Sequence, residues 1–308
     1  MAVKDDIKWF KGKFGAKVQT AFAGTPLTLD ILCAIALQET GYIWRKLVAK
    51  GLPANDVLRL CVGDVIDAPR RRAFPKNKEA LIAQPGGQQM FVLAHALLIE
   101  MGNATGIESY INAGRNANKF CRGYGIFQRD LQFFKDDPDY FLNQAWVDFD
   151  RCLDEAVKEL KKALRNLGYA DKPSLTDLQL CFVAIVYNTG FGNFDEDRGL
   201  KQGFEDEDGV FYGEHIAKFL NASKAVPIPS DTPAAVQTPG RYVVSARPNL
   251  NLRGGPGTTF GIKQSLDNGT VIHVLEFVDG ERGKWALVDI EGDGVRDGFV
   301  LANFIVPA

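Results

Sequence analysis

The chain has 308 residues, of which 46% are hydrophobic and 24% are charged, values typical of a globular protein with room for two domains. The formal net charge of −2 argues against a nucleic-acid partner, because binding by phosphate neutralisation needs an excess of basic side chains. No run approaches the ~18 apolar residues of a transmembrane helix, so we expect no membrane partner.

The N-terminal segment is charged and amphipathic rather than continuously apolar. Apolar side chains recur at helical spacing through residues 4–22 and predict an entry helix. The same segment lacks the apolar core of a secretory signal peptide. We therefore expect synthesis in the cytoplasm and delivery to any extracellular substrate by another route.

The next stretch, residues 25–42, reads TPLTLDILCAIALQETGY and predicts a helix that is apolar on every side. We expect Thr25 to cap its start and Gly41 to close its end. Glu39 would then sit at the exit of a buried helix, where desolvation and the negative end of the helix dipole both raise the pKa of a carboxyl group. Such a group can donate a proton near neutral pH. The competing interpretation of Glu39 is a solvated last-turn residue.

Further helices are predicted at residues 91–101, 142–167, 174–188 and 214–220, the third capped by Ser174 or Thr176. Residues 45–90 are polar and less regular, and the Gly-, Asn- and Arg-rich segment 112–130 is predicted as loop. His95 falls on an apolar helix, where a packed core histidine is the expected role.

We assign no cofactor and no metal to the chain. Its five cysteines are widely spaced and odd in number, which favours reduced thiols over a metal site or disulfides. The acidic stretches FEDEDG (204–209) and DIEGDGVRDG (289–298) lack the ligand spacing of a calcium loop. We interpret the first as a solvated loop and the second as a hairpin turn.

The pattern changes after residue 222. Residues 223–240 are rich in Pro, Ser, Thr and Ala and predict a linker. Residues 241–308 contain short alternating apolar runs separated by Gly, Pro, Asn and Asp, which indicate a small all-β unit. The predicted architecture is a mainly α domain over 1–222, the linker, and the β unit.

Three motifs stand at the ends of predicted elements: ETG (39–41), GIFQ (125–128) and YNTG (187–190). In this order they resemble the motifs of the lysozyme-like superfamily of lytic transglycosylases and goose-type lysozymes, over roughly residues 25–220. The resemblance implies a lysozyme-like fold and cleavage of the β-1,4 bond between N-acetylmuramic acid and N-acetylglucosamine in peptidoglycan.

The resemblance also implies roles for individual residues. Glu39 would be the catalytic acid and Gln128 would hold the sugar beside the scissile bond, while Tyr124, Tyr187 and Asn188 would line the substrate groove. The chain departs from the pattern in spacing: Glu39 and Gln128 are 89 positions apart, so residues 43–122 would be a large insertion.

Hydrolysis of a glycoside normally needs a second carboxyl group, about 5–5.5 Å or about 6.5–9.5 Å from the first. Asp64 and Asp67 are the candidates, with Arg70–Arg72 nearby to keep them ionised. Equally, these aspartates could cap a turn and pair with surface arginines. Lytic transglycosylation needs only one carboxyl group, because the substrate's own 6-hydroxyl attacks, and both chemistries stay open.

The β unit resembles the bacterial SH3-like domain in the segments LNLRGGPG (250–257), GTV (269–271), WALV (285–288) and GFV (298–300). That resemblance implies a wall-binding module, which a linker would tether close to polymeric substrate.

The leading hypothesis is therefore a monomeric peptidoglycan glycan-cleaving enzyme. A chitinase- or chitosanase-type hydrolase and a non-catalytic wall-binding adaptor are the alternatives. We expect delivery by a phage lysis programme or by a contact-dependent secretion system, the latter with a cognate inhibitor protein.

Overall fold

The structure, a computed structural model, describes residues 3–65, 73–228, 238–246, 249–281 and 283–308. The chain divides into two compact units, Met1–Ile228 and Pro229–Ala308. The division falls later than residue 222, because the last helix of the first unit continues to Lys224. Residues 229–237 of the predicted linker lie outside the described residues.

The first unit is mainly helical, with a short sheet. Its α-helices are α1 (Val3–Ala21), α2 (Leu29–Ala49), α3 (Ala54–Leu60), α4 (Lys78–Ile82), α5 (Gly87–Thr105), α6 (Glu108–Gly114), α7 (Pro138–Leu142), α8 (Phe149–Asn166), α9 (Asp177–Thr189) and α10 (Tyr212–Lys224). Short 3₁₀ turns, η1 (Leu131–Lys135), η2 (Ala145–Val147), η3 (Phe191–Asn193) and η4 (Glu196–Arg198), connect them.

Helix α2 forms the centre of this unit and is longer than predicted. Thr28, not Thr25, is its N-cap: the Thr28 hydroxyl accepts a hydrogen bond from the Ile31 amide. The helix continues through Gly41 because Trp44 and Leu47 beyond it are fully buried. Their burial outweighs the ~1 kcal/mol that a glycine costs inside a helix.

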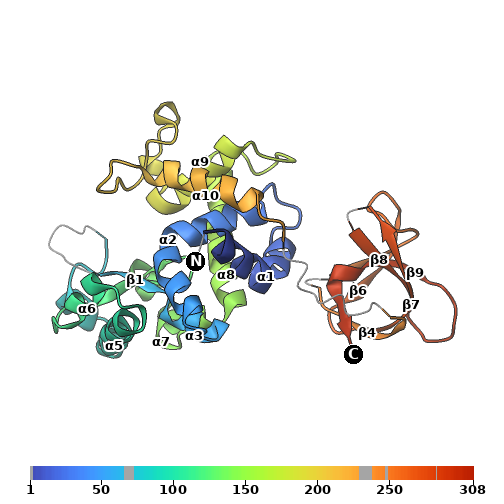
Figure 1. Cartoon of the computed structure of the whole chain (residues 1–308), viewed down its shortest axis with the longest axis horizontal. Coiled ribbons are helices and arrows are strands. Elements are labelled where there is room, and N and C mark those ends of the chain that lie inside the picture. The colour runs from blue at the N-terminus through green and yellow to red at the C-terminus, as the bar shows by residue number, and fades with distance from the viewer. Residues whose placement is uncertain (1–2, 66–72, 229–237, 247–248, 282) are drawn as a thin grey trace. The chain divides into compact units, whose positions relative to one another are not determined.

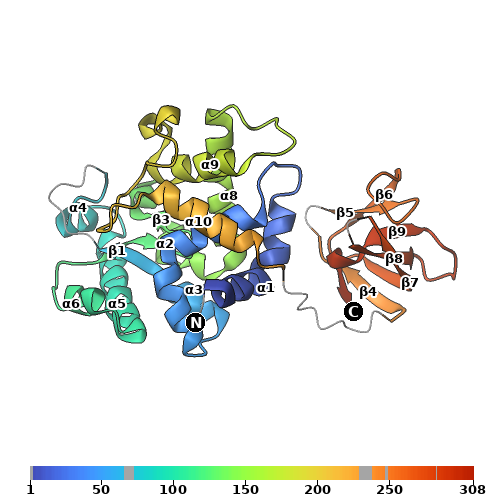
Figure 2. The ribbon, with the colours of Figure 1, turned by 45° about the horizontal axis from the view of Figure 1, so that its top comes forward.

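Helices α1 and α10 pack against α2, and Figures 1 and 2 show α10 (orange) beside α2 (blue). A buried lysine ties the three together. Lys11 of α1 contacts Asp30 of α2 at 2.7 Å and donates to the carbonyl oxygens of Ser223 and Val226 at 2.8 and 2.7 Å. These bonds hold the C-terminal end of α10 against the start of α2.

A three-stranded antiparallel sheet was not predicted. Strands β1 (Val62–Val65), β2 (Cys121–Tyr124) and β3 (Arg129–Asp130) pair in that order. They lie in the segments predicted as irregular or loop. The sequence does not predict them because strands of two to four residues are too short to show an alternating apolar pattern. Figure 2 shows β1 beside α5, against which it packs.

The predicted helix 142–167 is interrupted. Helix α8 begins at Phe149, and its cap Asp148 accepts a hydrogen bond from the Asp150 amide at 2.9 Å. Helix α9 starts as predicted after Thr176, in a capping box with Gln179.

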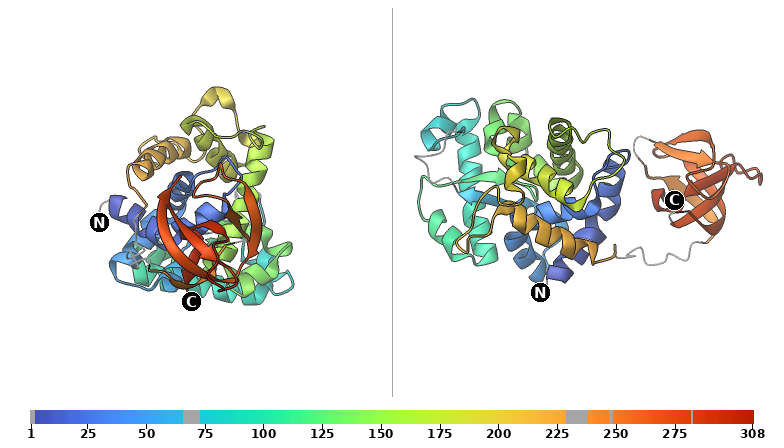
Figure 3. Two further views of the ribbon diagram at one scale, coloured as in Figure 1. Left: turned by 90° about the vertical axis from the view of Figure 1, so that its right-hand side faces the viewer. Right: turned by 90° about the horizontal axis from the view of Figure 1, so that it is seen from above.

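The second unit is a seven-stranded antiparallel sheet with strand order β10-β4-β7-β8-β9-β5-β6, and it curls on itself in Figure 3. Its strands are β4 (Gly240–Val244), β5 (Asn249–Arg253), β6 (Ile262–Asp267), β7 (Val271–Gly280), β8 (Gly283–Asp289), β9 (Gly298–Leu301) and β10 (Ile305–Pro307), with the 3₁₀ turn η5 (Ala302–Phe304) before β10. Trp285 is buried, and its indole nitrogen donates to the Glu281 carbonyl at 2.8 Å. The predicted architecture, a helical domain followed by a small all-β unit, is confirmed.

Candidate active site

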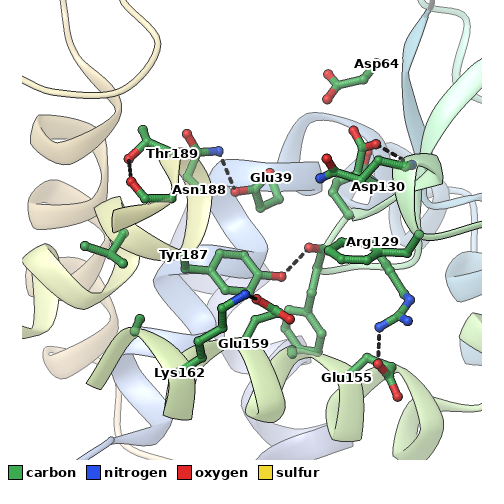
Figure 4. A pocket seen from close by; sticks show the side chains of 18 of the residues that line it. Glu39, Asp64, Arg129, Asp130, Glu155, Glu159, Lys162, Tyr187, Asn188 and Thr189 are labelled. Carbon is green, nitrogen blue, oxygen red and sulfur yellow. Dashed lines mark hydrogen bonds and ion pairs between the residues drawn. The ribbon is translucent and has the colours of Figure 1, made fainter. Parts of the chain in front are cut away.

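A cleft of about 1240 Å³ opens on the helical unit between α2, α8, α9 and the turn that joins β2 to β3. Five of the seven predicted site residues line it: Glu39, Asp64, Gln128, Tyr187 and Asn188. They come from four segments that are far apart in the sequence. Figure 4 shows Glu39 in the middle of this group, with Asn188 and Tyr187 on one side and Asp64 on the other.

Glu39 is half-buried and held by two neutral donors. The Tyr212 hydroxyl and the Asn188 side-chain amide both donate to Glu39 Oε1, at 2.8 and 3.4 Å. Burial raises the pKa of Glu39 from its ordinary 4.5 to about 7, although the hydrogen bond from Tyr212 acts in the opposite direction. The helix dipole has no part in this shift, because Glu39 lies inside α2 and not at its end.

The two donors decide which oxygen carries the proton. An amide nitrogen can only donate, so Oε1 acts as the acceptor of the pair. The Glu39 proton then belongs to Oε2, which makes no hydrogen bond to any residue that the structure describes.

Tyr212 was missed by the sequence analysis, which started the last helix at Glu214. It is the first residue of α10, is only 2% exposed, and its hydroxyl reaches Glu39 because α10 packs on α2. Burial raises the pKa of the Tyr212 hydroxyl, which therefore remains a donor. A local signal was available: Glu214 accepts a hydrogen bond from the Phe211 amide at 2.9 Å, the arrangement that marks a helix beginning at residue 212.

Gln128 is fixed in the turn between β2 and β3. Its side-chain amide donates to the carbonyl oxygens of Gly125 at 2.8 Å and Cys61 at 3.3 Å. Two glycines make room for it: a Cβ at Gly123 or Gly63 would lie 2.2 or 2.9 Å from Gln128 Oε1. Both positions therefore require glycine for this amide to stay in the cleft.

Of the two predicted tyrosines, one lines the cleft and one does not. Tyr187 is half-buried, and its hydroxyl donates to the Phe127 carbonyl at 2.7 Å, as drawn in Figure 4. Tyr124 is fully buried, with its ring 4.7 Å from that of Trp146 and its hydroxyl bonded to the Cys121 carbonyl. The prediction that Tyr124 contacts substrate is wrong, because its side chain points into the aromatic core.

Asp64 is a second carboxylate of the cleft. It lies in β1 with a φ of 53°, and its Oδ2 is 3.0 Å from an Arg122 guanidinium nitrogen. Arg122, which the sequence analysis missed, also pairs with Asp130. The expected partners Arg70–Arg72, and the second candidate Asp67, lie outside the described residues.

Strained backbone conformations also occur in the residues that line the cleft. Three described residues other than glycine have positive φ, and two of them, Asp64 and Gln128, line the cleft. Left-handed backbone costs such residues of order 1 kcal/mol or more, and it clusters at functional sites.

Other predicted features have structural roles. His95 is half-buried and not in the core, and its Nδ1 lies 2.7 Å from the Lys119 carbonyl oxygen. The acidic loops are turns: Asp206 pairs with His215 at 2.7 Å, and Asp289 accepts from backbone amides, including that of Gly292 at 2.7 Å.

Within the described ranges, no group of three or more His, Cys, Asp or Glu side chains is arranged to hold a metal. Of the helices that the structure describes, none is both long and apolar enough to span a bilayer.

Comparison with known proteins identifies the second unit. Residues 248–306 match the bacterial SH3 domain, so the β unit is a domain of this kind. No curated protein and no solved structure matches the chain.

Proposed function

We propose that the helical unit cleaves the β-1,4 bond between N-acetylmuramic acid and N-acetylglucosamine in peptidoglycan, with Glu39 as general acid. One observation carries this proposal: Glu39 stands in a large cleft, its hydrogen-bond partners among the described residues are neutral donors, and its pKa is about 7. A carboxyl group in that state is protonated in half or more of the molecules at neutral pH and below.

The surroundings of Glu39 suit both states of an acid catalyst. Burial favours the protonated form, which donates from Oε2 to the glycosidic oxygen as its bond to the anomeric carbon breaks. The hydrogen bonds from Tyr212 and Asn188 then favour the carboxylate that remains. The same two residues thus orient the acid before proton transfer and stabilise its conjugate base afterwards.

Two routes complete the reaction. In hydrolysis, the Asp64 carboxylate, which Arg122 holds in the same cleft, acts on a water or on the sugar cation. In lytic transglycosylation, the 6-hydroxyl of the substrate attacks, and Glu39 takes up its proton as base. Gln128, Tyr187 and Asn188 would contact the sugar rings in either route.

The bacterial SH3 domain would bind the wall. A tether of this kind raises the effective concentration of insoluble substrate at the cleft without a new contact to the scissile bond. The five cysteines are unpaired and buried, which suits synthesis in a reducing compartment. We propose delivery through a phage lysis programme or a contact-dependent secretion system, the latter with an inhibitor that blocks the cleft.

The test is digestion of insoluble peptidoglycan by the purified chain, with products identified by mass spectrometry. New reducing ends that disappear in Glu39→Gln identify hydrolysis, and anhydro-muropeptides identify transglycosylation. Wall binding without products would overturn the proposal in favour of an adaptor. Turnover of chitosan but not of peptidoglycan would overturn it in favour of a chitosanase.

A further inference from the structure

Two phenylalanine rings that line the cleft are exposed to solvent. Phe204 is 74% exposed, more than any other large hydrophobic side chain that the structure describes, and Phe191 is 47% exposed. Both line the cleft that holds Glu39. Exposed aromatic rings beside a binding groove are typical of a site that becomes covered when a ligand binds.

The ring of Phe204 stands on a fixed backbone. The Phe204 carbonyl accepts a hydrogen bond from the Tyr212 amide at 2.8 Å. Two positions earlier, Gln202 is 1% exposed, and its side chain bonds to the Gly199 carbonyl and the Asp195 amide at 2.6 and 2.8 Å. Phe204 is therefore exposed on a segment whose backbone is held in place by hydrogen bonds.

Phe191 is held in a similar way at the end of α9. It begins the turn η3, which follows Gly190 with a φ of +78°. Asn193 closes this turn, because its side-chain amide donates to the Thr189 carbonyl at 2.7 Å. The ring is thus three positions beyond Asn188, which bonds to Glu39.

We infer that Phe191 and Phe204 each provide a stacking platform for a sugar ring of the glycan strand, on the two segments that also supply Asn188 and Tyr212 to Glu39. The inference rests on the proposed function and assigns residues to substrate binding beyond those named above. A β-1,4-linked aminosugar in its chair form presents axial C–H groups on its faces, and such a face packs on an aromatic ring.

The charges of the cleft favour an uncharged sugar face, rather than an anionic group, as the partner of these rings. The cationic side chains that line the cleft among the described residues are Arg122, Arg129 and Lys162, and each is paired with a carboxylate. Each of these cations already has a carboxylate partner, with which an anionic peptide would have to compete. A sugar ring needs only the apolar surface and the nearby amides.

The experiment measures binding in the inactive Glu39→Gln protein, by calorimetry, with soluble glycan strands from which the stem peptides have been removed. Phe204→Ala and Phe191→Ala should each weaken binding on the order of tenfold, the effect expected when one aromatic side chain no longer buries its surface. Phe204→Tyr keeps the ring and should bind within about twofold of the parent.

Leu178→Ala is the matched control. Leu178 lies on α9, is 48% exposed, and does not line the cleft, so its loss should leave affinity unchanged. In the active protein, Phe204→Ala should raise KM by a similar factor and change kcat less, with an unchanged melting temperature.

The outcomes separate the two proposals. If the parent binds and cleaves strands but both alanine variants behave like Leu178→Ala, the platform is wrong and the proposed function stands. If the wild-type chain neither binds nor cleaves glycan strands, the proposed function fails and the platform fails with it. A rise in KM for Phe204→Ala that Phe204→Tyr does not share supports the platform.

Discussion

Two carboxyl groups on neighbouring helices of the helical unit are both shielded from water, but one has a charged partner and the other has neutral partners. Asp6 of α1 is fully buried and pairs with Arg45 of α2, whose guanidinium donates to it at 2.7 and 3.0 Å. Glu39 of α2 is half-buried and, among the residues that the structure describes, accepts hydrogen bonds from the neutral donors Tyr212 and Asn188.

The difference shows how one core can contain a structural and a reactive carboxyl group. The guanidinium of Arg45 supplies a positive charge opposite the buried Asp6 carboxyl group, and this contact joins α1 to α2. Neutral donors satisfy the carboxyl oxygen without supplying a compensating charge, so burial keeps the pKa of Glu39 near 7. The comparison predicts that changes at Glu39 affect chemistry, while changes at Asp6 affect stability.

The largest expected effect is on the rate of glycan cleavage by Glu39→Gln. Removing the proton donor should lower kcat by about a thousandfold or more, since general acid catalysis contributes about 10²–10⁴-fold. Release of products from peptidoglycan measures it. Glu79→Gln, at an exposed position on α4, is the control and should keep full activity. A Glu39→Gln protein of normal activity would remove Glu39 from the mechanism.

Asp6→Asn tests the structural side of the comparison. It leaves the Arg45 guanidinium without its carboxylate and should lower the free energy of unfolding by about 2 kcal/mol, less than for a fully buried pair because Arg45 reaches solvent. Chemical denaturation measures the loss, and Asp5→Asn at the exposed neighbouring position is the control. The folded variant should cleave glycan at the wild-type rate, and a selective loss of kcat would contradict the division of roles.

The pH dependence of stability should differ between wild type and Glu39→Gln. The pKa of Glu39 is about 7 in the folded chain and 4.5 when exposed, so between these values the folded state binds a proton that the unfolded state has lost. Rising pH therefore favours unfolding through this group. Across that window the wild type should lose roughly 2 to 3 kcal/mol relative to Glu39→Gln. Parallel stability curves for the two proteins would show that Glu39 is not desolvated.

The smallest expected effect is a shift of the pH–rate profile in Tyr212→Phe. This variant loses a hydrogen bond that favours the Glu39 carboxylate, so the pKa of Glu39 should rise and the alkaline limb of the profile should move up by about half a unit. Measuring kcat against pH tests it. Tyr169→Phe is the control, because Tyr169 does not line the cleft. A downward shift of the limb would contradict the assigned direction of the bond.

The sequence determined the parts of this protein that depend on short-range patterns. Apolar periodicity located the core helices, cap residues such as Thr176 marked a helix start, and turn residues separated the strands of the β unit. The three sequence motifs contain Glu39, Gln128, Tyr187 and Asn188, and all four line one cleft.

Only the tertiary structure decided which groups surround Glu39 and which leave the cleft. Tyr212 is 173 positions away in the sequence, and its hydroxyl meets Glu39 because α10 packs on α2. Arg122 contacts Asp64 because β1 and β2 pair in a sheet whose strands are too short to predict from the sequence. Tyr124 points into the core because Trp146 and other aromatic rings surround it there. Desolvation and hydrogen bonding depend on contacts between distant segments, so a pKa near 7 is a property of the folded cleft and not of the local sequence.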